Sequence, residues 1–178
     1  MNTLTSSVSG RAPEIHTLES GIDRVNARIR ELLEINETII IKVAGGSASG
    51  KTTKVSEEIL KYFQDQIIKI SMDDYYKGKT FMKDEEQKGN DLNWDQPEAL
   101  NLELLEKHIN ELRSGRKIKK PVYCMKTSEP IGVESVEPSK LILLEGLFTL
   151  RDELTETSEL KIFVESDTTT RLTRRILR

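Results

Sequence analysis

The sequence predicts an α/β fold in which helices flank a parallel sheet. Short apolar, β-branched runs that are typical of buried strands alternate along the chain with helical patterns of apolar residues. In the clearest example, an apolar run at residues 39–44 precedes a glycine-rich segment and then residues 52–63, where Val55, Ile59 and Phe63 share one helix face. This order places the glycine-rich loop at the carboxyl end of a strand, where open α/β sheets build their sites.

Residues 45–52 read Gly-Gly-Ser-Ala-Ser-Gly-Lys-Thr and match the phosphate-binding loop G-x-x-x-x-G-K-[ST]. Its glycines let the backbone approach phosphate oxygens, and its successive N–H groups bind anions together with the positive end of the next helix. Lys51 would reach the β- and γ-phosphates of ATP, and the Thr52 hydroxyl would ligate Mg²⁺. A plain turn would need neither residue. The motif therefore predicts a P-loop NTPase fold whose ATP-binding residues are Gly45, Gly46, Ser47, Ala48, Ser49, Gly50, Lys51, Thr52 and Thr53.

The bulk properties argue against several classes of protein. At 178 residues the chain is long enough for one domain with a sizeable core. A net charge of −3 gives no indication of a nucleic-acid or membrane partner. The single cysteine, Cys124, fits a reducing compartment, and the first residues lack the apolar run of a signal peptide. These features predict a cytoplasmic protein.

The N-terminal region predicts a disordered tail over residues 1–12 and an extra amphipathic helix over residues 13–36. The apolar residues of this helix recur at gaps of three and four, which suits a helix packed on its own domain and also a short coiled-coil seam. A homo-oligomer is therefore one of two alternatives. The residues that set the pattern are Ile15, Leu18, Ile22, Val25, Ile29 and Leu32.

The remaining elements belong to a domain that we expect to span residues 37–178. A polar loop is expected at residues 77–96, and two extended runs separated by a polar turn predict a β-hairpin that projects from the sheet. The expected strands and helices are a strand at 66–70, a helix at 97–112, the hairpin at 118–123 and 131–136, strands at 141–144 and 160–164, and a helix at 168–178.

Two carboxylates follow predicted strands and suit phosphoryl transfer. Asp73, just beyond the strand at 66–70, could accept a proton from an attacking hydroxyl, although a turn or helix cap explains its position equally well. Glu145 follows four apolar residues and could hold Mg²⁺ opposite Thr52; the alternative is an exposed glutamate at a strand end.

Four arginines crowd the last predicted helix: Arg171, Arg174, Arg175 and Arg178. Arginine binds oxyanions through a forked geometry, so the cluster could clamp a phosphoryl group. A solvated basic face is the more common fate of such a charge run.

Together these segments resemble the uridine kinase and phosphoribulokinase family, most closely its uridine–cytidine kinases, over residues 39–178. The resemblance rests on the loop at 45–52, Ser71-Met72-Asp73-Asp74-Tyr75-Tyr76-Lys77, Asn93-Trp94-Asp95-Gln96-Pro97-Glu98-Ala99, Leu144-Glu145-Gly146, and the arginine-rich helix. It implies that Asp73 is the catalytic base and that Lys51 is a second catalytic residue. It also implies acceptor contacts by Tyr76, Asp95 and Tyr123, and a phosphate clamp formed by Arg175 and Arg178. Asp74 stands where the family has serine.

The resemblance implies an ATP- and Mg²⁺-dependent kinase that phosphorylates the 5′-hydroxyl of uridine or cytidine. After Tyr123, however, Cys124, Met125 and Ser128 replace groups with which the family reads the base. A kinase for another hydroxylated metabolite, such as a sugar phosphate, is therefore an alternative, and so is a non-catalytic ATP-binding regulator. The family's C-terminal lid and last strand are absent from the sequence, which suggests a chain cut inside the domain. The sequence does not indicate a GTPase, because it contains no guanine-reading Asn-Lys-x-Asp motif.

Overall fold

The computed structural model of the protein describes residues 2–7, 14–151, 154 and 158–177. Its contacts divide the chain into two compact units. Unit 1 contains the residues up to Ile70 and those from Ser139 onward, and unit 2 contains Ser71–Pro138. The sequence predicted one domain from residue 37; the division arises because the insertion between two strands folds on itself. Within the described residues, none of the helices combines the length and the apolarity that a bilayer crossing needs.

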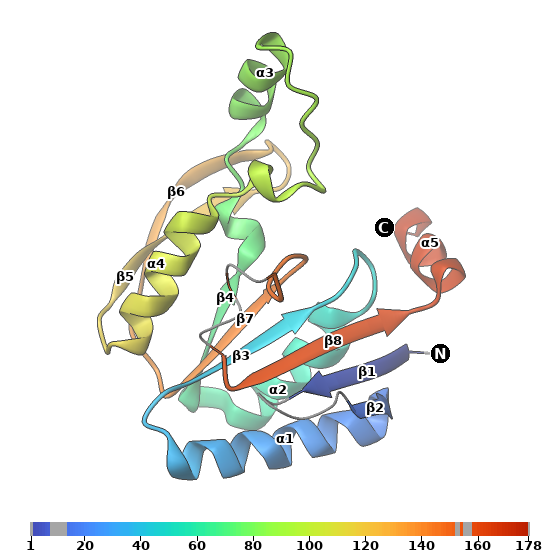
Figure 1. The fold of residues 1–178 in the computed structure, drawn as a ribbon, viewed down its shortest axis with the longest axis vertical. Helices are drawn as coiled ribbons and strands as arrows, with labels where there is room; N and C mark the ends of the chain where they lie inside the picture. The colour runs from blue at the N-terminus through green and yellow to red at the C-terminus, as the bar shows by residue number, and fades with distance from the viewer. Residues whose placement is uncertain (1, 8–13, 152–153, 155–157, 178) are drawn as a thin grey trace. The chain divides into compact units, whose positions relative to one another are not determined.

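Unit 1 is built on a six-stranded sheet in the order β2-β1-β8-β3-β7-β4 (Figure 1). Strand β3 runs parallel to both β7 and β8, which confirms the predicted parallel centre. Residues on both faces of β3 and β7 are buried, as is usual for strands of a parallel sheet. The strands are β1 (Asn2–Ser7), β2 (Glu14–Thr17), β3 (Ile39–Ala44), β4 (Ile67–Ser71), β7 (Leu141–Gly146) and β8 (Leu160–Ser166).

The N-terminal edge of the sheet differs from the prediction. Strand β1 pairs antiparallel with β8 and with β2, so the prediction of a disordered tail is wrong for Asn2–Ser7. Residues 8–12 of that predicted tail lie outside the described residues. The backbone of β8 offers the partners for this strand, and the Ser/Thr-rich composition of the segment gave no apolar alternation that would have revealed it.

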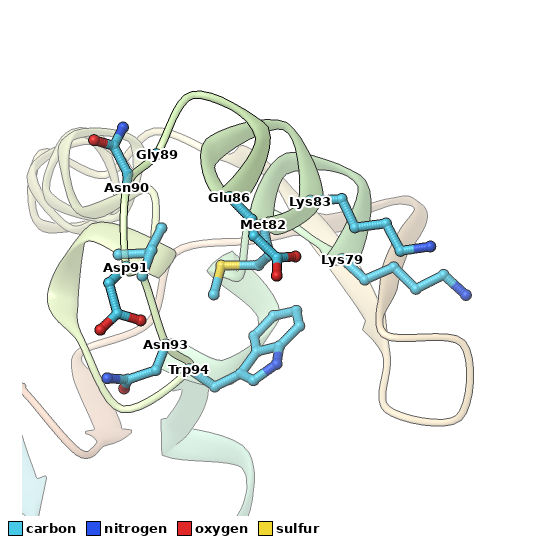
Figure 2. A pocket seen from close by; sticks show the side chains of 10 residues that line it. Lys79, Met82, Lys83, Glu86, Gly89, Asn90, Asp91, Asn93 and Trp94 are labelled. Carbon is cyan, nitrogen blue, oxygen red and sulfur yellow. The ribbon is translucent and has the colours of Figure 1, made fainter.

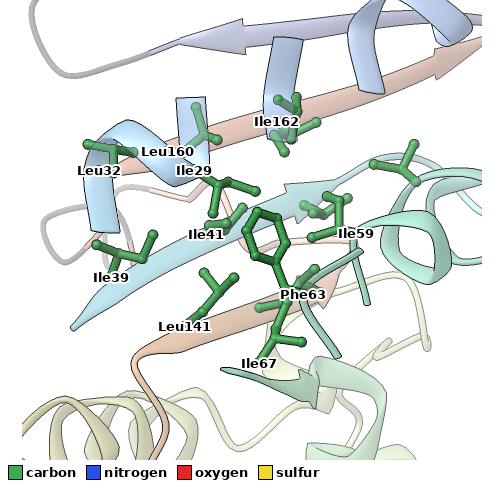
Figure 3. Packing of buried hydrophobic residues seen from close by; sticks show 14 of the residues in the cluster. Ile29, Leu32, Ile39, Ile41, Ile59, Phe63, Ile67, Leu141, Leu160 and Ile162 are labelled. Carbon is green, nitrogen blue, oxygen red and sulfur yellow. The ribbon is translucent and has the colours of Figure 1, made fainter. Parts of the chain in front are cut away.

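Helix α1 (Leu18–Ile35) begins five residues later than predicted. Residues 14–17 belong to β2, and the Thr17 hydroxyl accepts a hydrogen bond from the backbone N–H of Ser20, which caps the helix. The apolar residues of α1 face the core of unit 1, where Ile29 and Leu32 pack with residues of β3 and β8 (Figure 3). The structure therefore agrees with the intramolecular alternative for this helix.

The helix that follows the glycine loop lies on the same face of the sheet as α1 (Figure 1). It begins as a π-helix over Lys51–Ser56 and continues as α2 (Glu57–Phe63). Val55, Ile59 and Phe63, the residues predicted to share one face, are all buried in the core. Figure 3 labels Ile59 and Phe63 among them. Because the helix is packed in the core, the carboxyl end of the glycine loop, which leads into the helix, is held in place.

The described residues of unit 2 form two short 3-10 helices, two α-helices and a separate two-stranded sheet. Strands β5 and β6 pair antiparallel, which confirms the predicted hairpin, with an irregularity between Val122 and Tyr123. The prediction of a loop at 77–96 is wrong over Lys79–Gln87, which forms a helix without buried residues and therefore left little apolar pattern. The elements are η3 (Met72–Tyr75), α3 (Lys79–Gln87), η4 (Pro97–Ala99), α4 (Leu102–Arg113), β5 (Ile118–Cys124) and β6 (Glu129–Val136).

The packing of α1 yields a test of its role. Ile29 is fully buried, so Ile29→Ala should lower the free energy of unfolding by about 2–5 kcal/mol. Urea denaturation at two protein concentrations measures the loss, and the difference should not depend on concentration. Ile35 is 76% exposed on the same helix, and Ile35→Ala should have little effect. A concentration-dependent loss for Ile29→Ala would instead indicate that α1 pairs with a second copy.

Candidate functional site

The phosphate-binding loop joins β3 to the π-helix and holds a conformation that requires glycine. Gly50 has a φ of 94°, in the left-handed region that favours glycine, and its carbonyl accepts a hydrogen bond from the Lys54 N–H at 2.9 Å. Within the loop, the Ser49 N–H donates to the Gly46 carbonyl at 3.1 Å. Lys51 is half-buried and opens the π-helix, and Thr52 follows it. Loop and helix therefore have the order and turns that the motif predicts.

Two arginines of helix α5 (Thr168–Ile176) contact the loop. Arg171 Nε donates to the Ser47 carbonyl at 3.2 Å, and Arg174 Nη1 donates to the Ala48 carbonyl at 3.1 Å. The two residues are three positions apart, so they project from one face of the helix. A Cβ added to Gly46 would collide with the guanidinium of Arg171, so this close approach depends on glycine.

The residues predicted to clamp phosphate lie on the same helix. Arg175 is exposed, and Arg178 lies outside the described residues. The role of both therefore stays a prediction. The i, i+3 spacing of residues 171 and 174 in the sequence indicates only that they share a helix face; the fold brings them against the loop.

Glu145, at the end of β7, is buried and contacts two groups of unit 1. It accepts a hydrogen bond from the Thr52 hydroxyl, and its other carboxylate oxygen lies 3.0 Å from Lys69 Nζ. Its side chain is 6% exposed, which excludes the alternative of an exposed glutamate. A hydroxyl and a carboxylate side by side next to a phosphate loop are the hard oxygen ligands that Mg²⁺ takes beside substrate phosphates, so these residues fit a magnesium ion.

A pocket of about 400 Å³ lies beside the loop in unit 1. It is lined by Gly46 and Ser49 of the loop, by the end of β8, and by the start of α5 with Arg171. Helix α5 begins at this pocket because the Asp167 side chain accepts a hydrogen bond from the Thr170 N–H at 2.8 Å. The hydrogen bonds to the Thr170 hydroxyl and N–H lower the pKa of Asp167 to about 2. This carboxylate is therefore ionised at neutral pH and caps the helix as an anion.

In unit 2, the predicted acceptor residues gather around Tyr76. The Tyr76 ring lies 5.5 Å from the Trp94 ring and 5.5 Å from the Tyr123 ring, and its hydroxyl donates to the Trp94 carbonyl at 3.0 Å. Tyr76 directly follows η3, Trp94 lies in the segment before η4, and Tyr123 lies in β5. Sequence comparison pointed to Tyr76 and Tyr123; Trp94 adds a third ring to the cluster.

The electrostatics of this cluster involve the two predicted carboxylates of the acceptor side. Burial, together with the smaller effects of the charges of Asp73 and Asp95 and of Tyr123, raises the pKa of Tyr76 to about 12. Asp73 is held in the η3 turn, where its N–H donates to the Ser71 hydroxyl at 3.3 Å. Tyr76 thus stays protonated at neutral pH, and Asp73, Tyr76, Asp95 and Tyr123 lie in one region of unit 2.

The two other residues of the turn are anchored by buried partners. The Tyr75 hydroxyl lies 2.9 Å from His108 Nδ1 of α4, and both side chains are buried. The Asp74 carboxylate forms an ion pair with Lys120 of β5. The sequence gave no signal for either contact, because the partners are 33 and 46 positions apart.

A second pocket, of about 550 Å³, lies between α3 and the segment before η4 (Figure 2). The Trp94 ring and the Met82 side chain face each other across it, while Lys79 and Lys83 extend to one side (Figure 2). Helix α3 is tied to the hairpin by Glu129, whose carboxylate accepts hydrogen bonds from the N–H and the hydroxyl of Thr80 at 2.9 and 2.6 Å. Trp94 therefore borders both the ring cluster and this pocket.

Comparisons with known proteins agree with these features. Residues 40–178 match the model of the phosphoribulokinase / uridine kinase family. The chain is 39% identical over 144 residues to a uridine kinase of Brevibacillus brevis and 40% identical over 142 residues to one of Halalkalibacterium halodurans. Each alignment covers 79% of this chain, which spans 65% and 66% of the lengths of the two relatives.

Solved structures show the same fold. A putative fructose transport system kinase from Silicibacter sp. TM1040 superposes with a TM-score of 0.72 at 18% identity, covering 91% of this chain and 82% of that one. A possible uridine kinase from Bacillus stearothermophilus superposes with a TM-score of 0.58 at 20% identity and 77% coverage of both chains. The predicted α/β P-loop fold is therefore confirmed.

The contact between Gly46 and Arg171 can be tested by nucleotide binding. Gly46→Ala should weaken the binding of MgATP by about tenfold or more, because the added methyl displaces a cation from the loop and obstructs a phosphate contact worth about 1.5–3 kcal/mol. Isothermal titration calorimetry measures the affinity. Gly132 has open space around it, so Gly132→Ala is a matched control that should bind as the parent does. Equal affinities for all three proteins would show that the contact between Gly46 and Arg171 does not contribute to MgATP binding.

The buried His108 predicts a pH dependence of stability. Burial lowers its pKa below the value of about 6.5 that it has in the unfolded chain, although Glu111 acts in the opposite direction. The unfolded chain therefore binds a proton that the native state resists, and stability should fall as the pH drops below about 6.5. Urea denaturation at pH 7.5 and 5.5 should show a smaller loss for His108→Gln than for the parent chain. Equal losses in the two proteins would be inconsistent with a neutral, buried imidazole.

Proposed function

This chain belongs to the phosphoribulokinase / uridine kinase family, and on that basis we propose that it transfers the γ-phosphoryl group of ATP to the 5′-hydroxyl of a nucleoside, uridine or cytidine. The observation that carries the proposal is the group of three aromatic rings and two carboxylates around Tyr76 in unit 2. Aromatic rings stack with a planar base, and carboxylates accept hydrogen bonds from ribose hydroxyls.

The charge of this group favours a nucleoside over a phosphorylated sugar. The ionisable neighbours that act on Tyr76 are Asp73, Asp95 and Tyr123, and in the described part of the chain no cation acts on it in this way. A phosphate on the acceptor would need arginine or lysine partners and would be repelled by two carboxylates. The neighbouring Lys77 lies with its ammonium 4.6 Å from the centre of the Phe81 ring. A neutral polyhydroxyl acceptor therefore fits the cluster better.

The phosphate loop would hold the donor. Backbone N–H groups of residues 45–52 and the Lys51 ammonium bind the β- and γ-phosphates. Arg171 and Arg174, which contact loop carbonyls in this structure, are close enough to the loop to contribute positive charge, and Arg175 is the further candidate that the family resemblance indicates. Thr52 and Glu145 would hold Mg²⁺, which neutralises phosphate charge when it is bound.

Asp73 would act as the general base. As the acceptor hydroxyl oxygen forms a bond to the γ-phosphorus, the Asp73 carboxylate takes the hydroxyl proton, and the bond from the γ-phosphorus to the β–γ bridging oxygen breaks to release ADP. Asp95 and Tyr123 would hold the sugar side of the acceptor, and Tyr76 and Trp94 would provide ring contacts.

An acceptor panel tests the proposal directly. Uridine, cytidine and ribulose 5-phosphate, each mixed with radiolabelled ATP, should give labelled product with the nucleosides only. Turnover of the sugar phosphate alone would overturn the proposal in favour of another metabolite kinase. ATP binding without any acceptor-dependent release of ADP would favour a regulatory role.

Substitution of the proposed base gives a separate test. Asp73→Asn should lower kcat for uridine by about 10²- to 10⁴-fold, because the amide cannot accept the proton, while the affinity for MgATP should stay within about twofold. Steady-state kinetics and calorimetry measure the two quantities on the same preparation. A kcat within a few-fold of that of the parent chain would show that Asp73 is not the base.

A further inference from the structure

Lys120 of β5 carries a buried positive charge that the proposed reaction does not use. Only 5% of the residue is exposed, yet its ammonium finds three acceptors. Its Nζ lies 2.5 Å from Asp74 Oδ2 and 2.9 Å from Glu134 Oε1, and it donates to the Pro121 carbonyl at 3.2 Å. An ammonium has three N–H donors, so this one is fully satisfied.

A contribution to stability is a weak explanation for the buried ion pair between Lys120 and Asp74. Removing a charge from water is costly, and well-packed apolar residues in place of a buried ion pair are often as stable or more so. What the pair does impose is geometry, because a buried cation can be satisfied only when its partners occupy fixed positions. The consequence depends on which segments the two residues join.

Asp74 and Lys120 connect the two segments that carry acceptor residues. Asp74 lies in the η3 turn between Asp73 and Tyr76, and Lys120 precedes Tyr123 by three residues on β5. The other carboxylate oxygen of Asp74 lies 3.5 Å from the backbone N of Tyr123, so Asp74 contacts this strand at two points.

The opposite side of the turn is held separately. The Tyr75 carbonyl accepts a hydrogen bond from the Asn101 N–H at 2.9 Å, and the Tyr75 hydroxyl contacts His108 of α4. The turn is therefore anchored to α4 through Tyr75 and to the hairpin through Asp74. Of these two anchors, only Asp74 reaches the strand that carries Tyr123.

We propose that Asp74 and Lys120 are positioning residues that set the distance between the Asp73–Tyr76 turn and the Tyr123 strand, and thereby the shape of the acceptor site. The proposal rests on the proposed function, because it takes Asp73 as the base and the rings as acceptor contacts.

A double-mutant cycle tests the pair. Asp74→Asn and Lys120→Met should each lower kcat/KM for the acceptor by about 10- to 100-fold, while KM for ATP stays within about twofold. The double variant should be no worse than the more impaired single variant, because each change already removes the same ion pair. Lys117→Met is the matched control, since Lys117 forms an exposed pair with Glu137 near the same hairpin. It should leave all of these values unchanged.

A second readout does not depend on catalysis. Trp94 is the single tryptophan of the chain, and Tyr76 contacts its ring, so its fluorescence reports on the position of the turn. Asp74→Asn should shift its emission to longer wavelength and increase its quenching by acrylamide, and Lys117→Met should do neither. If Lys120→Met fails to fold, as judged by lost MgATP binding, the comparison of Asp74→Asn with Lys117→Met decides.

The two readouts separate failure of this inference from failure of the proposed function. If no acceptor is turned over but the Trp94 signal changes in Asp74→Asn and not in Lys117→Met, the positioning role holds and the proposed reaction does not. If Asp74→Asn and Lys117→Met behave alike in acceptor kinetics and in fluorescence, the positioning role is overturned. Strictly additive losses in the cycle would also overturn it, because two residues that act through one contact cannot contribute independently.

Discussion

A charge inside a protein is costly unless a partner and hydrogen bonds accompany it, and each unit of this chain organises its functional segment around one such charge. In unit 1 the buried Glu145 is held between the Thr52 hydroxyl and the Lys69 ammonium. In unit 2 the buried Lys120 is held by two carboxylates and a carbonyl. In both places the partner comes from a segment that carries predicted site residues, so satisfying the charge also positions those residues.

In unit 1, two arginine side chains place positive charge next to the loop. Arg171 and Arg174 donate to loop carbonyls, which satisfies their guanidinium groups in part and keeps positive charge next to the place where phosphates would bind. Carbonyls are weaker partners for a guanidinium than phosphate oxygens are. An arriving triphosphate could therefore replace them at a net gain, and glycine at position 46 leaves room for the guanidinium on the loop.

The sequence predicted those parts of the molecule that depend on local pattern. The loop at 45–52, strands β3 and β7, and the hairpin all carry a motif or a run of apolar residues that determines them locally. Strand β1 was missed because it depends on pairing with β8, more than 150 positions away, and helix α3 because it buries no residues. For the same reason no pattern could reveal Arg171 on the loop or Asp74 on Lys120, which are contacts between distant segments.

The composition of the acceptor cluster also bears on selectivity. The family resemblance implies polar groups after Tyr123 that read the edge of the base, and this chain has Cys124, Met125 and Ser128 there. Hydrogen bonds to a base edge discriminate strongly, because the wrong base leaves buried polar groups unpaired, but stacking on aromatic rings tolerates any planar base. On the proposed function, Tyr76, Trp94 and Tyr123 would supply the aromatic faces for such contacts. On the proposed function, the site should therefore hold the sugar through its carboxylates with more selectivity than it shows toward the base.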